Sequence, residues 1–225
     1  MLRFQVLAAL LIALFPLAGI VRRMPDALAS DSSIGDLAVV ELSVVEATHG
    51  ERLLGQTTRL GLHQIGPSHC YLQVPLYVAL GRQRPALSIT CVLANWLALI
   101  AFGYALVRWY DNRLAVWLWL LLLPPYFGYY ESPTLFNYWP QYLIVFPTMP
   151  FIACAAAVAT GRRAMWPAVL GLASFIAQGY GSTLLPVAVV LASLLALEVA
   201  RSVRRQPLPT GEPVGWRSWG PRLTP

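Results

Sequence analysis

Residues 86–107 read ALSITCVLANWLALIAFGYALV and carry no charged side chain. An α-helix rises about 1.5 Å per residue, so a helix of this length crosses the roughly 30 Å hydrocarbon core of a lipid bilayer. Five further apolar stretches are long enough to form such helices, at residues 4–21, 114–129, 142–160, 164–180 and 182–200. The sequence therefore predicts an all-α, polytopic membrane protein with about six transmembrane helices.

The composition of the chain agrees with this class. Hydrophobic residues make up 57% of the 225 residues and charged residues only 12%, about half the charged fraction of a soluble domain. Strands of a transmembrane β-barrel would alternate apolar and polar residues over segments of roughly ten, and the apolar stretches do not alternate. Because lipid offers no hydrogen-bond partners to the backbone, helices are the remaining architecture.

Arginine supplies all sixteen basic residues of the chain, and their positions predict how the helices are oriented. If the N-terminus is cytoplasmic, the inside segments are 1–3, 108–113, 161–163 and 201–225, and they contain ten arginines. This distribution follows the positive-inside rule, so we expect a cell-membrane protein with both termini in the cytoplasm. The net charge of +6 then indicates orientation and does not indicate a nucleic-acid partner.

The two ends of the chain admit separate interpretations. Ala27-Leu28-Ala29 fits a signal-peptide cleavage site. However, residues 4–21 form a longer apolar stretch than a usual signal sequence, and Arg22 and Arg23 separate it from that site, so a first transmembrane helix is favoured. Residues 201–225 are rich in proline, glycine and arginine and predict a disordered cytoplasmic tail.

Polar residues concentrate in 22–85, the predicted large first external loop. Ser33 and Asp36 are spaced as a capping box in which Asp replaces the usual Glu. Apolar residues then recur at helical spacing: Leu37, Val40, Val44 and Ala47. With Gly50 as the C-cap, this pattern predicts a short interfacial helix. Asp36 then lies in its first turn, where the helix dipole stabilises a negative charge.

A glycine-rich segment follows this helix. Arg59 and His63 lie in it and offer cationic groups at the membrane face, suited to a phosphate or to lipid head groups. Pro67 fits the first turn of a second short helix that ends near Gly81. This helix is too short to span a membrane, so we expect it to lie in the interface or to re-enter.

The order of these motifs resembles that of bacterial polytopic GT-C-type glycosyltransferases. The matching residues in the first loop are Gly35, Asp36, Ala38, Glu41, Leu42, Gly50, Glu51, Leu53, Leu54, Gly55, Thr58, Arg59, Gly61, His63, Gly66, Pro67, Tyr71, Pro75 and Gly81. Those in later segments are Trp139, Pro140, Pro147, Gly161, Arg162, Arg163, Pro167, Ser174, Phe175, Gln178 and Pro186. The resemblance covers residues 1 to about 200, the predicted membrane-embedded domain.

The resemblance implies transfer of a sugar from a polyprenyl-phosphate carrier to an acceptor on the outer face of the membrane. It further implies that an acid in the first external loop acts as a general base or helps to bind a metal, and Asp36 occupies the matching position. Arg59 and His63 would stabilise the departing lipid phosphate, and Glu41 is a further substrate-binding candidate. The spacing of the acids, histidines and cysteines does not itself indicate a metal site.

Three residues outside the first loop complete the candidate substrate site. Glu131 lies among the aromatic residues of 126–142, which form either an interfacial aromatic belt or a surface for stacking on a sugar. Gln178 is a polar residue in an apolar helix, and such residues face other helices. Tyr180 stands where relatives carry histidine.

A transporter and a membrane interaction protein are the two other classes of protein that this composition suits. A transporter would place ionisable residues near the bilayer midplane and show repeated halves, and neither feature is evident. A catalytically incomplete membrane interaction protein, or a gene fragment of such an enzyme, is the alternative, because the family it resembles is longer than this chain. The expected partners are a polyprenyl-phosphate-linked sugar and membrane lipids.

Overall fold

The computed structural model describes residues 7, 21–22, 25, 35–57, 61, 63–109 and 136–204. The elements of the described chain are all helical: α2 (Asp36–Thr48), α3 (Ser68–Ala79), α4 (Pro85–Trp109), α7 (Pro140–Leu143), α8 (Val145–Ala159), η1 (Arg163–Met165), α9 (Trp166–Gly179), η2 (Gly181–Thr183) and α10 (Leu184–Arg204). An isolated β-bridge joins Thr57 to His63. The all-α prediction is confirmed for these residues.

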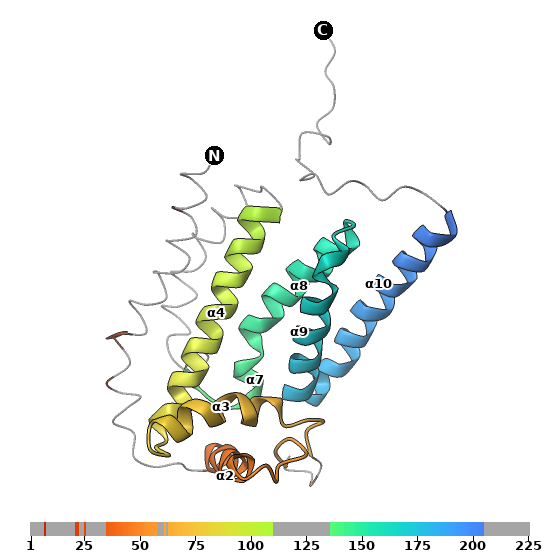
Figure 1. Ribbon diagram of the computed structural model, residues 1–225. Helices are drawn as coiled ribbons and strands as arrows, with labels where there is room; N and C mark the ends of the chain where they lie inside the picture. The colour runs from red at the N-terminus through yellow and green to blue at the C-terminus, as the bar shows by residue number, and fades with distance from the viewer. Residues whose placement is uncertain are drawn as a thin grey trace.

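The long helices form a bundle that is covered at one end (Figure 1). α4, α8, α9 and α10 stand side by side, while α2 and α3 lie across one end of them. α4, α8 and α10 run away from this end and α9 returns to it. We call it the loop end, and the opposite end, where η1 and the C-terminus of α10 lie, the arginine end.

Three helices of the described chain are long and apolar enough to cross a membrane: Pro85–Leu106, Pro140–Ala159 and Gly181–Val203. α9 has 14 residues, or about 21 Å, and is not one of these three helices, so the described residues do not confirm all six predicted spans. The predicted helices 4–21 and 114–129 lie outside the described residues. α10 extends to Arg204, so residues 201–204 are helical and not part of a disordered tail.

The two sides of the predicted topology correspond to the two ends of the bundle. Residues 161–163 and 201–204 lie at the arginine end, whereas α2, α3 and residue 181 lie at the loop end. Arg162 donates to the carbonyl oxygen of Trp109 at the C-terminus of α4. Arg162, one of the arginines from which the orientation of the helices was predicted, therefore also caps α4, because the last carbonyl groups of a helix lack partners within it.

The ends of α2 differ slightly from the expected ones. Gly35 is the N-cap with φ 62° and makes no side-chain cap, so Asp36 is the first helical residue and not the third residue after a Ser33 cap. Ser33 lies outside the described residues. At the other end the helix stops at Thr48 with His49 as the C-cap, one residue before the expected C-cap Gly50. Gly50 has φ 75°, a left-handed conformation that glycine adopts without steric cost.

The apolar face of α2 packs into one of two core clusters. Val40, Val44 and Ala47 are buried, as their spacing predicts, in a cluster that also contains side chains of α3, α4 and α7. A second cluster joins α8, α9 and α10. Burial of a valine or leucine contributes about 1.5 to 3 kcal/mol, so the first cluster holds the loop end onto the bundle.

Candidate functional site

Asp36 is the first residue of α2, in the layer of short helices that covers the loop end of the bundle. Its side chain is half-buried, and the next residue, Leu37, packs against the cluster that contains Tyr138. The hydroxyl of Tyr138 accepts a hydrogen bond from Nε of Arg84 at 3.0 Å. Asp36 thus lies at the positive end of the α2 dipole, next to a residue that anchors α2 to the core.

Glu41 lies five residues further along α2, which rotates it about 140° from Asp36. It is half-buried and faces α3, where it acts on the phenol of Tyr77. Burial raises the pKa of Tyr77 and the Glu41 carboxylate raises it further, while Arg82 acts in the opposite direction. The carboxylates of Asp36 and Glu41 consequently point to different neighbours.

An ion pair ties the C-terminal half of α2 to the following loop. Arg52 contacts Oε2 of Glu46 at 2.6 Å and donates to the carbonyl oxygen of Gly55 at 2.7 Å. Its own carbonyl accepts from the hydroxyl of Tyr71 at 3.0 Å. The sequence gives no sign of this pair, because residues six positions apart do not share a helical face. The conformation of the loop after α2 brings Arg52 back to Glu46.

The loop that contains His63 folds back on itself. Gly55 donates to the carbonyl of Gln64, and Gln64 donates to that of Gln56, both at 3.0 Å. Nδ1 of His63 lies 3.2 Å from the carbonyl oxygen of Gly55 and 3.4 Å from Oγ1 of Thr57. The His63 side chain is exposed, and its ring is oriented by the carbonyl group of Gly55.

This loop docks on the corner between α9 and α10. Oε1 of Gln64 accepts a hydrogen bond from the amide of Gly181 at 2.8 Å. A Cβ atom on Gly66 would lie 2.6 Å from Cγ and 2.7 Å from Cδ of Gln178, so the Gln178 side chain rests directly on the Gly66 backbone. Gln178 itself donates to Oγ of Ser174 at 2.8 Å.

The predicted site residues therefore fall into two groups at the loop end. The loop that contains His63 meets Gln178 and Gly181, and Tyr180 between these two residues is 36% exposed. Asp36 lies at the far end of α2, about 15 Å along the helix axis from Glu46. α2, which Asp36 begins, packs mainly on α3, and α3 in turn packs on α9. Arg59 and Glu131 lie outside the described residues.

Polar side chains that the sequence analysis did not consider are buried beneath the loop. His69 and Gln73 in α3 are 0% exposed and Gln56 is 2% exposed. Burial, with a smaller contribution from Arg52, lowers the pKa of His69 from 6.5 to about 4. Within the described chain, Nδ1 of His69 and the Oε1 atoms of both glutamines have no hydrogen-bond partner. Buried polar side chains thus lie beside the apolar cluster at the loop end, and burial favours the neutral form of His69.

Acid is expected to destabilise the protein through His69. The unfolded chain binds a proton near pH 6.5 and the folded chain only near pH 4, so stability is complete above pH 6.5 and declines as the pH falls towards 4. We expect a loss of about 2 kcal/mol between pH 7.5 and 5, measured by unfolding in detergent. His69→Gln should remove this loss, and the exposed His49→Gln should retain it; equal profiles for the two variants would contradict the assignment.

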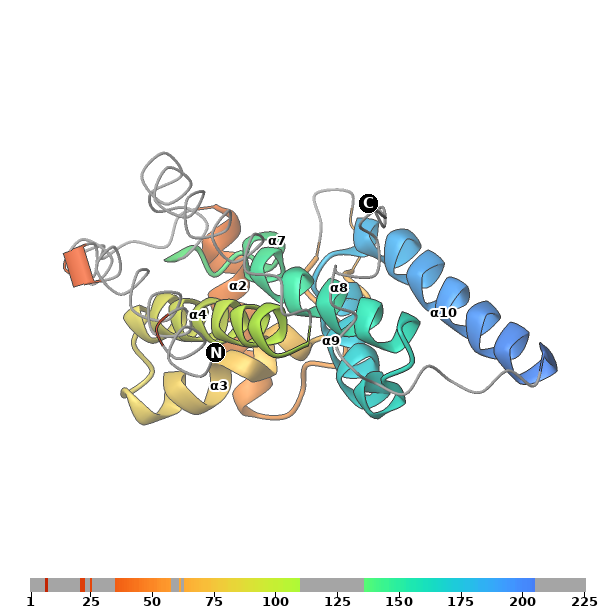
Figure 2. The ribbon, with the colours of Figure 1, turned by 90° about the horizontal axis from the view of Figure 1, so that it is seen from above.

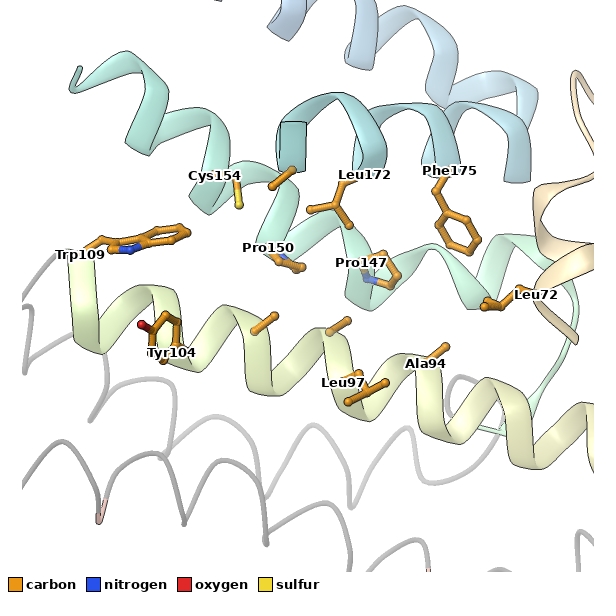
Figure 3. A pocket seen from close by; sticks show the side chains of 13 residues that line it. Leu72, Ala94, Leu97, Tyr104, Trp109, Pro147, Pro150, Cys154, Leu172 and Phe175 are labelled. Carbon is orange, nitrogen blue, oxygen red and sulfur yellow. The ribbon is translucent and has the colours of Figure 1, made fainter. Parts of the chain in front are cut away.

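An apolar groove of about 450 Å³ runs between α4, α8 and α9 (Figure 3). Trp109 and Tyr104 lie at one end of it, and Leu72 of α3 lies at the other. Pro147, Pro150 and Phe175 line the middle. Since Leu72 belongs to α3 at the loop end and Trp109 ends α4 at the opposite end, the groove extends from the arginine end to the loop end.

These features define an all-α protein with three helices of membrane-spanning length and a layer of short helices across one end. Comparison with protein-family models, with curated proteins and with solved structures finds no match for this chain. Among the described residues, no group of three or more His, Cys, Asp or Glu side chains is arranged to hold a metal ion.

Proposed function

We propose that this protein is a membrane glycosyltransferase of the GT-C type, which transfers a hexose or pentose from a polyprenyl-phosphate carrier to an acceptor outside the cytoplasmic membrane. The proposal includes six transmembrane helices with both termini in the cytoplasm, so that the loop end faces outwards. The excess of arginine in the segments at the arginine end supports this orientation.

The groove is the observation that carries the proposal. An isoprenoid chain is apolar and long, so its carrier site needs an apolar channel within the membrane that meets polar residues at the surface. The groove has an apolar lining and reaches Leu72 of α3. Gln178 lies on α9, which forms one wall of the groove, and contacts the His63 loop at Gly66. A carrier chain in the groove would therefore place its phosphate near these polar groups.

The chemistry follows from the groups at the loop end. The Asp36 carboxylate would take the proton from the acceptor hydroxyl as that oxygen attacks the anomeric carbon of the sugar. The bond from that carbon to the carrier phosphate breaks with inversion, and the electron pair leaves on the phosphate oxygen. Arg59 and His63 would stabilise the negative charge that develops there. Glu131, Gln178 and Tyr180 would bind the sugar.

Asp36→Asn tests the role of the base. We expect at least a hundredfold loss of transfer, because general-base catalysis contributes about 10² to 10⁴ in rate. The assay supplies polyprenyl phosphates that carry labelled hexoses or pentoses to membranes that contain the protein and the native acceptors. The amount of protein in the membrane should not change, since Asp36 is only half-buried.

Glu51→Gln is the matched control for this experiment. It also replaces an acid by its amide at the loop end, but Glu51 is exposed and follows α2. We expect this variant to retain transfer. Transfer by Asp36→Asn at the parental rate would remove Asp36 from the chemistry. No transfer by the parent protein from any carrier would favour a membrane interaction protein.

A further inference from the structure

α3 differs from an ordinary surface helix because its exposed side chains are apolar while two polar side chains are buried. The helix of a soluble protein turns its apolar face to the core and its polar face to water. In α3, His69 and Gln73 are completely buried, whereas Tyr71, Leu72 and Val78 are 38%, 40% and 48% exposed. The buried face of α3 therefore carries His69 and Gln73 beside Cys70 and Tyr77, whereas its exposed face is apolar.

The exposed side chains of α3 form one continuous stripe. Its members are Tyr71, Leu72, Pro75, Val78 and Ala79, which recur at the spacing of a single helical face. Viewed along the bundle, α3 lies towards one edge of the molecule beside α4 (Figure 2). α3 itself thus lies near the side of the bundle, next to one of the long helices.

The stripe adjoins a helix of membrane-spanning length at one end and an exposed arginine at the other. Leu72 lines the apolar groove together with Ala94 and Leu97 of α4, and α4 is one of the helices of membrane-spanning length. The stripe is therefore continuous with the apolar surface of that helix. At its other end the chain turns through Gly81 and Arg82, and the exposed Arg82 places a positive charge where the apolar surface stops.

We propose that the outer stripe of α3 is embedded among the acyl chains of one leaflet, with Arg82 at the level of the lipid head groups. Acyl chains are the occupant that this surface fits, because they accept apolar side chains and Arg82 suits the phosphate above them. The polar residues of α3 are then sheltered from both water and lipid. This inference does not rest on the proposed enzymatic activity.

The full chain reconstituted in vesicles of phosphatidylcholine and phosphatidylglycerol provides the test. A nitroxide label on Val78→Cys reports collisions with oxygen, which concentrates in lipid, and with a water-soluble nickel chelate. The native Cys70, Cys91 and Cys154 are buried, so the label enters at the introduced site. Ala79→Cys is a second position on the stripe in case the first variant is poorly folded.

Two labelled positions calibrate the measurement. Val189→Cys lies on the exposed face of α10, within a helix of membrane-spanning length, and Glu51→Cys lies on an exposed charged position of the loop. We expect the stripe to give an oxygen-to-nickel collision ratio within about twofold of that at 189 and several-fold above that at 51. A ratio like that of residue 51 would show that the stripe faces water, and low collision rates with both reagents would show that a protein surface covers it. Either result would overturn the proposal.

Discussion

Gly55→Ala is expected to separate the first loop from the helical bundle and to lower the free energy of unfolding by about 3 kcal/mol. The new Cβ atom would lie 2.9 Å from the carbonyl oxygen of Gly66 and 3.1 Å from that of Gln64, and would also meet Cβ of Gln64. These atoms belong to the backbone or adjoin it, so no side-chain rotation relieves the contacts. Overpacking of this kind costs about 1 to 3 kcal/mol, and the hydrogen bond from Arg52 to Gly55 would be strained as well.

Gly171→Ala provides the matched control. Gly171 lies in α9 with open space around its Cβ position, so alanine there should leave stability unchanged or raise it by up to about 1 kcal/mol. Unfolding in detergent measures both variants, and limited proteolysis of residues 51–67 reports whether the loop has separated. Equal stability of the two variants, with an intact loop, would contradict the close packing at Gly55.

Arg201→Ala is expected to cost about 2 to 3 kcal/mol at the arginine end. Its guanidinium contacts Oε1 of Glu198 at 3.2 Å and donates to the carbonyl oxygens of Val158 and Ala159 at the C-terminus of α8. Arg201 and Glu198 have side chains that are only 19% and 17% exposed. Removal of one partner leaves a largely buried carboxylate with less compensation and leaves the α8 carbonyls without their cap.

Arg163→Ala is the comparison for Arg201→Ala, because it also removes a positive charge next to Glu198 but from an exposed position. Arg163 contacts the same carboxylate of Glu198 at 2.5 Å, but its side chain is 51% exposed. Water screens such a pair, and its contribution is about 1 kcal/mol or less. Thermal unfolding of the two variants in detergent should therefore rank Arg201→Ala well below Arg163→Ala. The reverse order would show that capping of α8 contributes little.

Local sequence patterns predict the helices well. The charge-free stretch at 86–107 becomes α4, and the spacing of Val40, Val44 and Ala47 places these residues in the core. Pro67 immediately precedes α3. Such features depend on side chains a few residues apart, because helix formation, capping and amphipathicity are properties of neighbouring residues.

The arrangement of the candidate site is less predictable. Gln64 and Gly181 are 117 residues apart, yet they form a hydrogen bond, and Gly66 makes room for Gln178. A glycine in a loop also signals turns of many kinds, so its sequence context does not reveal which side chain will pack against it.

The order of the amino acids therefore accounts for the all-α class, for the helices of membrane-spanning length, and for the presence of short helices between residues 36 and 79. Hydrophobic content and helical periodicity are sufficient for these features. Tertiary packing alone brings the loop onto α9 and α10, buries His69 and Gln73, and turns the apolar stripe of α3 outwards. These outcomes depend on which surfaces meet, and such contacts join residues far apart in the chain.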